Sequence, residues 1–375
     1  MLKIMTIVGT RPELIKMSRV IAEFDSNTNH TLVHTGQNYD YELNQVFFED
    51  MGIRRPDYFL EVASENAAQT IARVIEKSDE VMRKVKPDAL LLYGDTNSCL
   101  AVIAAKRQKI PVFHMEAGNR CFDQRVPEEL NRKVIDHLSD INFVLTEHAR
   151  RYLIAEGIRQ EMIFKTGSHM REVLEYYMPK IDQSDILDRM QLESRKFFIV
   201  SAHREENIDT DQNLKDMVET LNAIASKYNY PVIVSTHPRT RNRLNELKLV
   251  GLDSNVRFLK PFGFSDYIKL QIEALCVLSD SGTITEEASL LNLQAIMLRN
   301  AHERPEGMDS GTTIMSGLSK KRVLDAIRII LDSSSGVENL ISPVSDYETN
   351  KLVSKQILRV VVSYIEYINR TIWSK

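Results

Sequence analysis

The sequence predicts an α/β protein with two Rossmann-like, doubly wound domains, and three features of the chain support that fold class. In both halves, short apolar runs alternate with longer stretches of helical periodicity, the pattern of a mostly parallel sheet covered by helices. The length of 375 residues exceeds what one hydrophobic core usually serves. The alternation is interrupted over residues 170–195, where apolar periodicity weakens and charge rises. We therefore place a domain boundary there.

The first half of the chain contains five apolar runs with the length of β-strands, each followed by an amphipathic stretch of helix length. This βα rhythm predicts an N-terminal domain over residues 1–175. The predicted strands are 3–9, 30–36, 88–95, 111–118 and 141–146.

A second series of five apolar runs follows the boundary and predicts a C-terminal domain over residues 195–348. Beyond a polar stretch, an apolar-periodic helix is predicted near 350–372. This last segment, 349–375, could cap either domain, and we expect it to pack back on the N-terminal one. The predicted strands of the second series are 197–203, 231–237, 256–261, 276–282 and 294–299.

The charge and cysteine content of the chain indicate partners that are small molecules or proteins. The 48 Lys and Arg residues nearly balance 52 Asp and Glu residues, for a net charge of −4, so a nucleic-acid partner is not expected. No apolar stretch reaches membrane-spanning length, and the first apolar run is too short for a signal peptide. The three cysteines are widely spaced and form no CxxC pair, which argues against a disulfide framework or structural zinc. We expect a cytoplasmic location.

Polar and charged residues recur where the predicted strands end. In open parallel sheets, ligands bind beyond the carboxyl ends of the strands, where loops and helix N-termini meet. Residues of this kind in both domains predict an active site in the interdomain cleft. They are Arg11 and Lys16, Asp95, Glu116, His203 and Arg204, and Ser281, Gly282 and Glu287.

Each of these motifs also has a purely structural explanation. Arg11 with Pro12 and Glu13 can simply open a helix, since Pro suits the first turn and Glu suits the helix dipole. Asp95 can serve a helix N-cap. Gly282 can belong to a turn, although backbone N–H groups at a helix N-terminus also bind anions.

Two other groups of residues are better explained by structure than by chemistry. His203 and His237 end predicted strands without HExxH spacing or a nearby Cys or His partner, so we predict no metal site. Glu129 and Lys133 are four residues apart in "PEELNRK" and are expected to lie on the exposed, charged start of a helix.

Taken together, the strand-end residues favour a site that holds a phosphate ester. Cationic groups and anion-binding turns accompany the carboxylates Asp95, Glu116 and Glu128, which suits proton transfer on the group attached to the phosphate. The chain has neither the GxxxxGK[ST] motif of phosphoryl transfer nor the GxGxxG motif of a nicotinamide site. The nucleotide is therefore predicted to be part of the substrate rather than an energy source or a redox partner.

Six motifs, in order and across nearly the whole chain, resemble those of the non-hydrolysing UDP-N-acetylglucosamine 2-epimerases. They are "GTRPELIK", "GDTNS", "HMEAGNR" with "PEELNR", "HREEN", "DSGTITEE" and "ERPE". The resemblance implies a glycosyltransferase-B-like fold, with UDP bound mainly by the second domain and the sugar facing the first. It also implies a homodimer and cofactor-independent epimerisation, in which UDP leaves a 2-acetamidoglycal and then adds back.

The same resemblance implies roles for individual residues. The implied catalytic residues are Asp95, Glu116, Glu128 and His203, with carboxylates exchanging protons at the two faces of C2. The implied substrate-binding residues are Arg11 and Lys16 near the phosphates, Ser281, Gly282 and Thr283 in a diphosphate turn, Glu287 at the ribose, Tyr267 against uracil, and Arg132, Arg204 and Arg304.

The stretch "FHMEAGNRCFDQRVPEELNRK" resembles the branch of this family that acts on UDP-linked 6-deoxy-L-hexosamines. We therefore expect conversion of UDP-N-acetyl-L-pneumosamine to UDP-N-acetyl-L-fucosamine for capsule or O-antigen synthesis, with UDP-GlcNAc and UDP-ManNAc as the alternative pair. Asn38 replaces a family histidine near a loop that binds UDP-GlcNAc as an activator, so such activation is expected to be lost or altered. A retaining glycosyltransferase, a hydrolysing 2-epimerase and a non-catalytic UDP-sugar-binding protein remain open.

Overall fold

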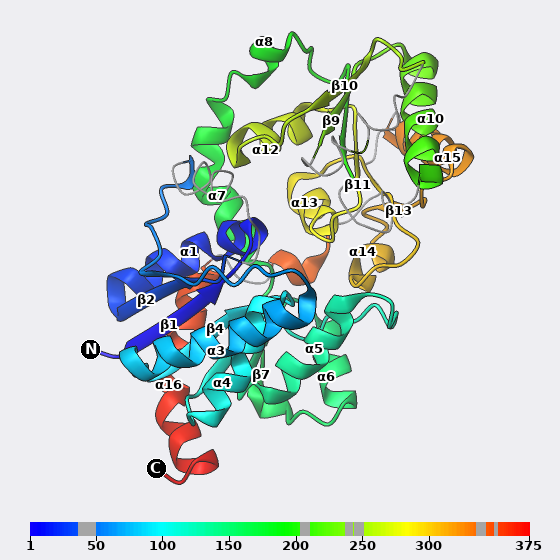
Figure 1. Ribbon diagram of the computed structural model, residues 1–375. Coiled ribbons are helices and arrows are strands. Elements are labelled where there is room, and N and C mark those ends of the chain that lie inside the picture. The colour runs from blue at the N-terminus through cyan, green and yellow to red at the C-terminus, as the bar shows by residue number, and fades with distance from the viewer. Residues whose placement is uncertain (37–49, 203–210, 237–242, 244–250, 335–342, 349–351) are drawn as a thin grey trace. The chain divides into compact units, whose positions relative to one another are not determined.

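The chain folds around two parallel sheets, which belong to two separate units (Figure 1). Unit 1 contains Met1–Tyr176 and Asp346–Lys375, and unit 2 contains Tyr177–Ser345. The chain passes from unit 1 to unit 2 within α7 (His169–Asp182) and returns within η3 (Ser345–Glu348). This computed structural model describes residues 1–36, 50–202, 211–236, 243, 251–334, 343–348 and 352–375.

The sheet of unit 1 has seven parallel strands in the order β3-β2-β1-β4-β5-β6-β7. The chain adds strands to one side of β1 and then continues on its other side from β4. This is a doubly wound topology with its switch point between β1 and β4. The strands are β1 (Lys3–Val8), β2 (Asn29–His34), β3 (Tyr58–Phe59), β4 (Ala89–Tyr93), β5 (Val112–Met115), β6 (Ile141–Val144) and β7 (Ile163–Lys165).

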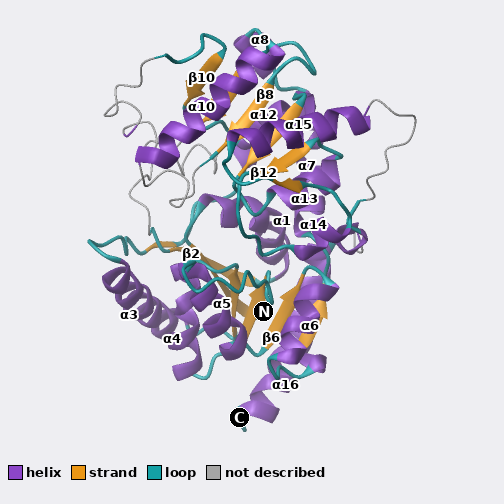
Figure 2. Ribbon diagram, turned by 90° about the vertical axis from the view of Figure 1, so that its right-hand side faces the viewer, coloured by secondary structure: helices purple, strands orange, loops and turns teal. Residues whose placement is uncertain are grey.

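Side chains of the unit 1 sheet alternate between two hydrophobic cores, as the period of a strand requires. On β4, Leu91 and Tyr93 belong to the core that includes α1 and α16, whereas Leu90 and Leu92 belong to the core that includes α3 and α4. Figure 2 shows α3 and α4 side by side. The helices of unit 1 are α1 (Arg11–Asn27), α3 (Ala67–Val85), η1 (Asn97–Ala101), α4 (Val102–Arg107), α5 (Pro127–Leu138), α6 (Glu147–Ala155), η2 (Gln160–Met162) and α16 (Val353–Ile372).

The C-terminal helix α16 packs against α1 and completes one core of unit 1 (Figure 1). Its buried apolar residues recur every three or four positions, which forms one stripe along the helix. No helix in the described part of the chain combines the length and apolar character needed to cross a membrane. The buried apolar residues of α16 are Val353, Ile357, Val361, Ile365 and Ile368.

The sheet of unit 2 has six parallel strands in the order β10-β9-β8-β11-β12-β13, with the switch point between β8 and β11. On β8, Phe198 and Val200 face the core of α10 and α15, which lie side by side in Figure 1, and Ile199 faces the core of α12 and α13. The strands are β8 (Phe198–Ser201), β9 (Val232–Ser235), β10 (Val256–Leu259), β11 (Cys276–Ser279), β12 (Ala295–Met297) and β13 (Ile314–Met315). The further helices are α8 (Ile186–Met190), α10 (Asp211–Tyr228), α12 (Phe264–Glu273), α13 (Ile284–Leu291), α14 (Pro305–Asp309) and α15 (Lys320–Ser334).

The structure confirms the predicted fold class and places a strand in each of the ten apolar runs. It also contains β3, β7 and β13, which the sequence pattern did not indicate. These strands have only two or three residues and lie at sheet edges, so they carry too few positions for a period to be recognised. Residues 170–195, where the pattern weakens, form most of α7 and all of α8.

Candidate active site

The loops that follow β1, β4 and β5 meet at the switch point of the unit 1 sheet. β1 pairs with β4, and β4 pairs with β5, so their carboxyl ends are neighbours. The N–H of Gly94, directly after β4, donates to the carbonyl of Met115 at the end of β5 at 3.0 Å. The fold therefore brings the motifs "GTRPELIK", "GDTNS" and "HMEAGNR" together at the carboxyl ends of these three strands.

Glu116 follows β5 at the carboxyl ends of these strands, where Lys16 and Tyr93 contact it. The Nζ of Lys16 donates to Oε2 of Glu116 at 2.7 Å, and the hydroxyl of Tyr93 donates to the same oxygen. Behind it, Nε2 of His169 lies 2.9 Å from the hydroxyl oxygen of Tyr93. Glu116 has a φ of 61°, in the left-handed region that a residue with a β-carbon rarely adopts. Such strain at a polar residue is typical of functional sites.

Asp95 is held by α5 on the neighbouring loop. Nε of Arg132 donates to Oδ2 of Asp95 at 2.8 Å, and Nδ2 of Asn131 donates to the backbone carbonyl of Asp95 at 2.9 Å. The other arm of the Arg132 guanidinium donates to Glu129 at 2.9 Å. Arg132 is therefore a buried bridge that fixes Asp95 to the start of α5.

The structure corrects the expected position of Glu129 on an exposed helix start. Glu129 is fully buried and accepts hydrogen bonds from the backbone N–H groups of Cys121 and Phe122, each at 3.1 Å. Its ion pair is with Arg132, not Lys133. The loop that precedes α5 folds back over the first turn of the helix, and this tertiary contact buries the carboxylate.

Glu128 lies in the first turn of α5 and is half-buried. It precedes Arg132 by four residues, so both side chains project from the same face of the helix, the face that contacts Asp95. No described residue forms a hydrogen bond or an ion pair with the carboxylate of Glu128. The three predicted carboxylates thus lie in unit 1, Asp95 and Glu116 on neighbouring loops and Glu128 in the first turn of α5.

A buried network supports the loop that carries Glu116. Asp136 on α5 lies within 2.9 Å of Nδ1 of His114 and accepts from Arg120 at 2.7 Å. The Asp136 carboxylate also accepts from the N–H of Gly118, at 3.2 Å and 3.3 Å to its two oxygens. Burial raises the pKa of Asp136, but the hydrogen bond from His114 and the charge of Arg120 outweigh burial and leave the pKa lowered.

Glu13 is a further buried carboxyl group at this edge, and its Oε2 accepts from the N–H of Gly9 at 2.6 Å. Burial and, to a lesser degree, the charge of Asp95 raise the pKa of Glu13, whereas hydrogen bonds from Thr96 and the N–H of Gly9 lower it; the net result is a pKa of about 7. The sequence suggested only a dipole-stabilising residue here. A carboxyl group that titrates near neutral pH is a candidate for proton exchange.

The raised pKa of Glu13 predicts a specific dependence of stability on pH. In the unfolded chain the carboxyl ionises near pH 4.5, whereas in the folded protein it keeps its proton until about pH 7. Wild-type stability should therefore fall between these values, by up to roughly 3 kcal/mol, because only the unfolded state has lost the proton. Glu13→Gln should lack this component in urea unfolding measured at pH 5 and pH 8. Equal pH dependence in the two proteins would contradict it.

The predicted diphosphate turn of unit 2 connects β11 to α13. The hydroxyl oxygens of Ser281 and Thr283 lie 2.9 Å apart, and the N–H of Thr283 donates to Oγ of Ser281 at 3.3 Å. A β-carbon on Gly282 would collide with Oε1 of Glu303. A larger residue at this position would require the Glu303 side chain to shift. The turn lies at the N-terminus of α13, where backbone N–H groups can bind an anion.

The remaining predicted contacts of unit 2 lie on α12, α13 and α14. Nε2 of Gln271 donates to Oε2 of Glu287 at 2.7 Å, which orients that largely buried carboxylate. Arg304 is buried and pairs with Glu286 at 2.9 Å. Tyr267 is half-buried against the core of α12 and α13. Binding roles for these residues stay predictions.

Several predicted residues are not part of the structural description. His203, Arg204, His237 and Asn38 lie outside the described residues. Arg11 is described as the first residue of α1 and is half-buried. Within the described ranges, no group of three or more His, Cys, Asp or Glu side chains is arranged to hold a metal ion.

The sequence reasoning missed Tyr93, His169 and Asp136. Tyr93 ends an apolar strand and therefore resembles a core residue, and His169 follows the short strand β7, which the pattern did not reveal. Their position at strand ends was the only available signal. Asp136 lies within the helix of "PEELNRKVIDHL" and gave no such signal.

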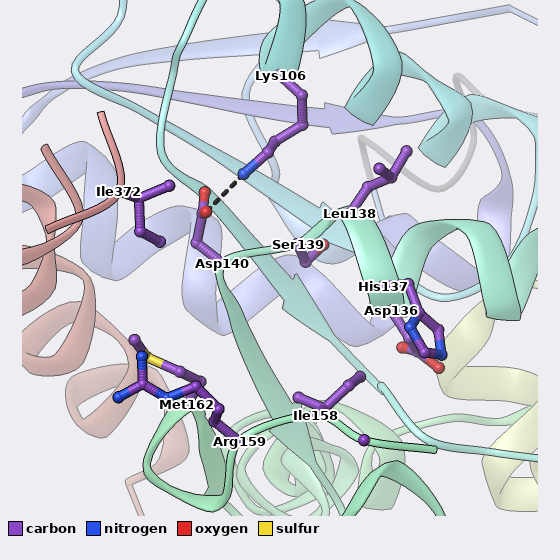
Figure 3. A pocket seen from close by; sticks show the side chains of 11 residues that line it. Lys106, Asp136, His137, Leu138, Ser139, Asp140, Ile158, Arg159, Met162 and Ile372 are labelled. Atoms are coloured by element: carbon purple, nitrogen blue, oxygen red, sulfur yellow. Dashed lines mark hydrogen bonds and ion pairs between the residues drawn. The ribbon is translucent and has the colours of Figure 1, made fainter. Parts of the chain in front are cut away.

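Unit 1 also contains a separate hollow, which lies near the amino-terminal ends of β6 and β7 (Figure 3). Lys106 and Asp140 form an ion pair of 2.5 Å in its wall, and Met162 and Ile372 add apolar surface. It contains none of the predicted site residues. Since ligands of open parallel sheets bind at the carboxyl ends of strands, we do not assign the site to this hollow.

Two doubly wound parallel units, with polar loops at their switch points, define a glycosyltransferase-B-like fold. The family model described as "UDP-N-acetylglucosamine 2-epimerase" matches residues 22–361. A UDP-N-acetylglucosamine 2-epimerase of Methanococcus maripaludis is 34% identical over 360 residues, covering 94% of this chain and 97% of the relative. The chain belongs to the UDP-N-acetylglucosamine 2-epimerase family and is an isomerase.

Solved structures of this family are similar along the whole chain. The structure titled UDP-N-acetylglucosamine 2-epimerase from Rickettsia bellii is 60% identical, covers 100% of both chains and has a TM-score of 0.93. The Methanocaldococcus jannaschii UDP-GlcNAc 2-epimerase in complex with UDP-GlcNAc and UDP is 31% identical, covers 96% of this chain and 100% of that chain, and has a TM-score of 0.87.

Proposed function

We propose that this enzyme inverts C2 of a UDP-N-acetylhexosamine by eliminating UDP and adding it back. One observation carries the proposal most directly: adjacent loops of unit 1 hold Asp95 and Glu116, each in contact with its own cation, beside the helix turn of Glu128. These contacts with Arg132 and Lys16 fix the positions of the two carboxylates. Carboxylates on two loops and one helix turn can approach a sugar ring from different sides.

The chemistry needs groups of this kind. In the elimination, the C2–H and C1–O bonds break, which releases UDP and leaves a 2-acetamidoglycal; in the return step, a proton reaches the opposite face of C2 as UDP adds to C1. Two acid or base groups are therefore required, one for each face. Because no carbonyl group acidifies the C2 hydrogen, the barrier depends on stabilising the departing diphosphate and the positive charge at C1.

In this proposal, unit 2 binds the UDP portion of the substrate. The turn of Ser281, Gly282 and Thr283 lies at the N-terminus of α13, where backbone N–H groups favour phosphate. Glu287, oriented by Gln271, would accept hydrogen bonds from the ribose hydroxyls. Tyr267 would stack on uracil.

UDP-GlcNAc is the substrate that the comparisons favour. The relative and both similar structures are named as UDP-GlcNAc 2-epimerases, and the Methanocaldococcus jannaschii structure is a complex with UDP-GlcNAc and UDP. The second candidate is UDP-N-acetyl-L-pneumosamine, which the sequence "NRCFDQR" of the loop favours. A homodimer and a role in capsule or O-antigen synthesis stay predictions.

Proton NMR in deuterated buffer tests the reaction and the substrate together. UDP-GlcNAc and UDP-N-acetyl-L-pneumosamine are incubated separately with the enzyme, and loss of the H2 signal and formation of the C2 epimer are followed. We expect deuterium at C2 and a second sugar nucleotide with UDP-GlcNAc. Exchange with the deoxy sugar alone would reassign the substrate. No exchange with either sugar, in a protein that binds UDP, would contradict the epimerase proposal.

A further inference from the structure

A continuous chain of side-chain contacts leads from the protein interior to Glu116. His169, the first residue of α7, is 2% exposed, and Tyr93 at the end of β4 is 3% exposed. Their rings meet edge to face with centroids 5.0 Å apart, and Nε2 of His169 lies 2.9 Å from the hydroxyl oxygen of Tyr93. The Tyr93 hydroxyl in turn contacts Oε2 of Glu116.

The partners in this chain determine where the hydrogens lie. Lys16 donates to Oε2 of Glu116 at 2.7 Å, so Oε2 acts as the acceptor of an ionised carboxylate. The Tyr93 hydroxyl must then donate its only hydrogen to Oε2. Its oxygen can therefore only accept from His169, which places a hydrogen on Nε2 of that ring.

We propose that Tyr93 and His169 are positioning residues that orient Glu116 for proton exchange with the sugar. This inference rests on the proposed function, in which Glu116 is one of the proton-handling carboxylates. The donors from α1 and β4 both bind Oε2, so they anchor this oxygen and orient the carboxylate. His169 prevents the Tyr93 hydroxyl from rotating away, because it occupies the lone pair of the hydroxyl oxygen.

The positive φ of Glu116 is consistent with this role. Glu116 has a backbone φ of 61°, and its side chain contacts Lys16 and Tyr93. Such a strained backbone conformation persists only when surrounding contacts hold it. The ring of Tyr93 belongs to the apolar core of unit 1, and Tyr93→Phe keeps that ring. Removal of the single hydroxyl oxygen should therefore alter turnover more than folding.

The test compares Tyr93→Phe with Tyr364→Phe in the full-length enzyme. Tyr364 is an aromatic residue of α16 that packs edge to face on Phe164, away from the Glu116 loop, so its variant controls for loss of a tyrosine hydroxyl. We expect Tyr93→Phe to lower kcat about 100-fold, because a misplaced catalytic group loses its near-attack geometry, with KM little changed. Tyr364→Phe should retain wild-type kcat.

Variants of His169 complete the test. His169→Ala should lower kcat toward the value of Tyr93→Phe, whereas His169→Gln should recover much of the loss because its amide N–H can donate to the Tyr93 hydroxyl. The double variant Tyr93→Phe/His169→Ala should be no slower than Tyr93→Phe alone, since the two residues act in series. Melting temperatures measured alongside identify a variant that merely unfolds.

Wild-type turnover is measured first and separates the two proposals. Absence of C2 exchange in the wild type would overturn the proposed function and this inference with it. Normal wild-type turnover with an unchanged kcat in Tyr93→Phe would overturn the inference alone. So would a His169→Gln variant as slow as His169→Ala at an unchanged melting temperature.

Discussion

Glu128→Gln is expected to lower kcat by about 10²- to 10⁴-fold, the range typical of losing a general acid or base, while the melting temperature stays close to wild type. The amide has nearly the same shape as the carboxylate but cannot accept a proton. No described residue pairs with Glu128, so the substitution breaks no ion pair or hydrogen bond of the described structure. UDP affinity, measured by calorimetry, should also be retained.

Glu129→Gln is the matched control, because it makes the same chemical change at the next position. Glu129 is buried, pairs with Arg132 and accepts two backbone N–H groups, so its substitution should lower the melting temperature. Glu128→Gln is thus expected to lower activity at nearly unchanged stability, whereas Glu129→Gln is expected to lower stability. A Glu128→Gln enzyme with normal turnover would remove Glu128 from the reaction, and a large loss of its stability would make its role structural.

Asp136→Asn is expected to destabilise unit 1 by about 3–5 kcal/mol, the usual effect of removing one partner of a buried ion pair. The substitution leaves the guanidinium of Arg120 facing an amide, and it weakens the bonds to His114 and Gly118. The loop that carries Glu116 begins beside these residues. We therefore expect kcat to fall as well, even where the variant is still folded. Urea unfolding and turnover at 25 °C measure the two effects.

Asp140→Asn provides the comparison for Asp136→Asn. Asp140 is also buried and pairs with Lys106, but it lies at the opposite edge of the same sheet. Its loss should affect stability without lowering the kcat of the folded enzyme. Equal losses of kcat in both variants would contradict the role of Asp136 in supporting the Glu116 loop.

The lowered pKa of Asp136 adds a pH dependence to this prediction. Its folded pKa lies below the unfolded value, so its stabilisation is complete above about pH 4 and is lost as pH falls further. The stability gap between wild type and Asp136→Asn should therefore shrink below roughly pH 4 in unfolding experiments. A constant gap down to acidic pH would show that the charge of Asp136 is unimportant.

The fold was predictable because its signals are local and repeated. A strand such as β4, "ALLLY", is apolar at every position, which only a strand buried on both faces requires. Helix starts such as "TRPELIK" carry Pro and Glu in the first turn. The edge strands β3 and β13 escaped detection because two residues cannot display a period.

The candidate site was predictable only in part. Strand ends and their order indicated Asp95, Glu116 and Lys16, since parallel strands bring their carboxyl ends to one edge. The ion pair of Lys16 with Glu116 joins residues 100 positions apart and has no sequence signal. The family resemblance assigns Lys16 to the phosphates, whereas in the structure its ammonium group contacts the carboxylate of Glu116.

The amino-acid pattern alone determined the α/β class, the two sheets and the family, because each depends on periodicity or on motifs read in order. Tertiary structure alone decided which of two adjacent glutamates is buried, which cation contacts which carboxylate, and that Tyr93 contacts both Glu116 and His169. The physical reason is that burial and hydrogen bonding at a strand end depend on the residues that other strands and helices bring there. Local sequence places a side chain on a face or at an end, but the neighbours that fix its charge and direction arrive from distant parts of the chain.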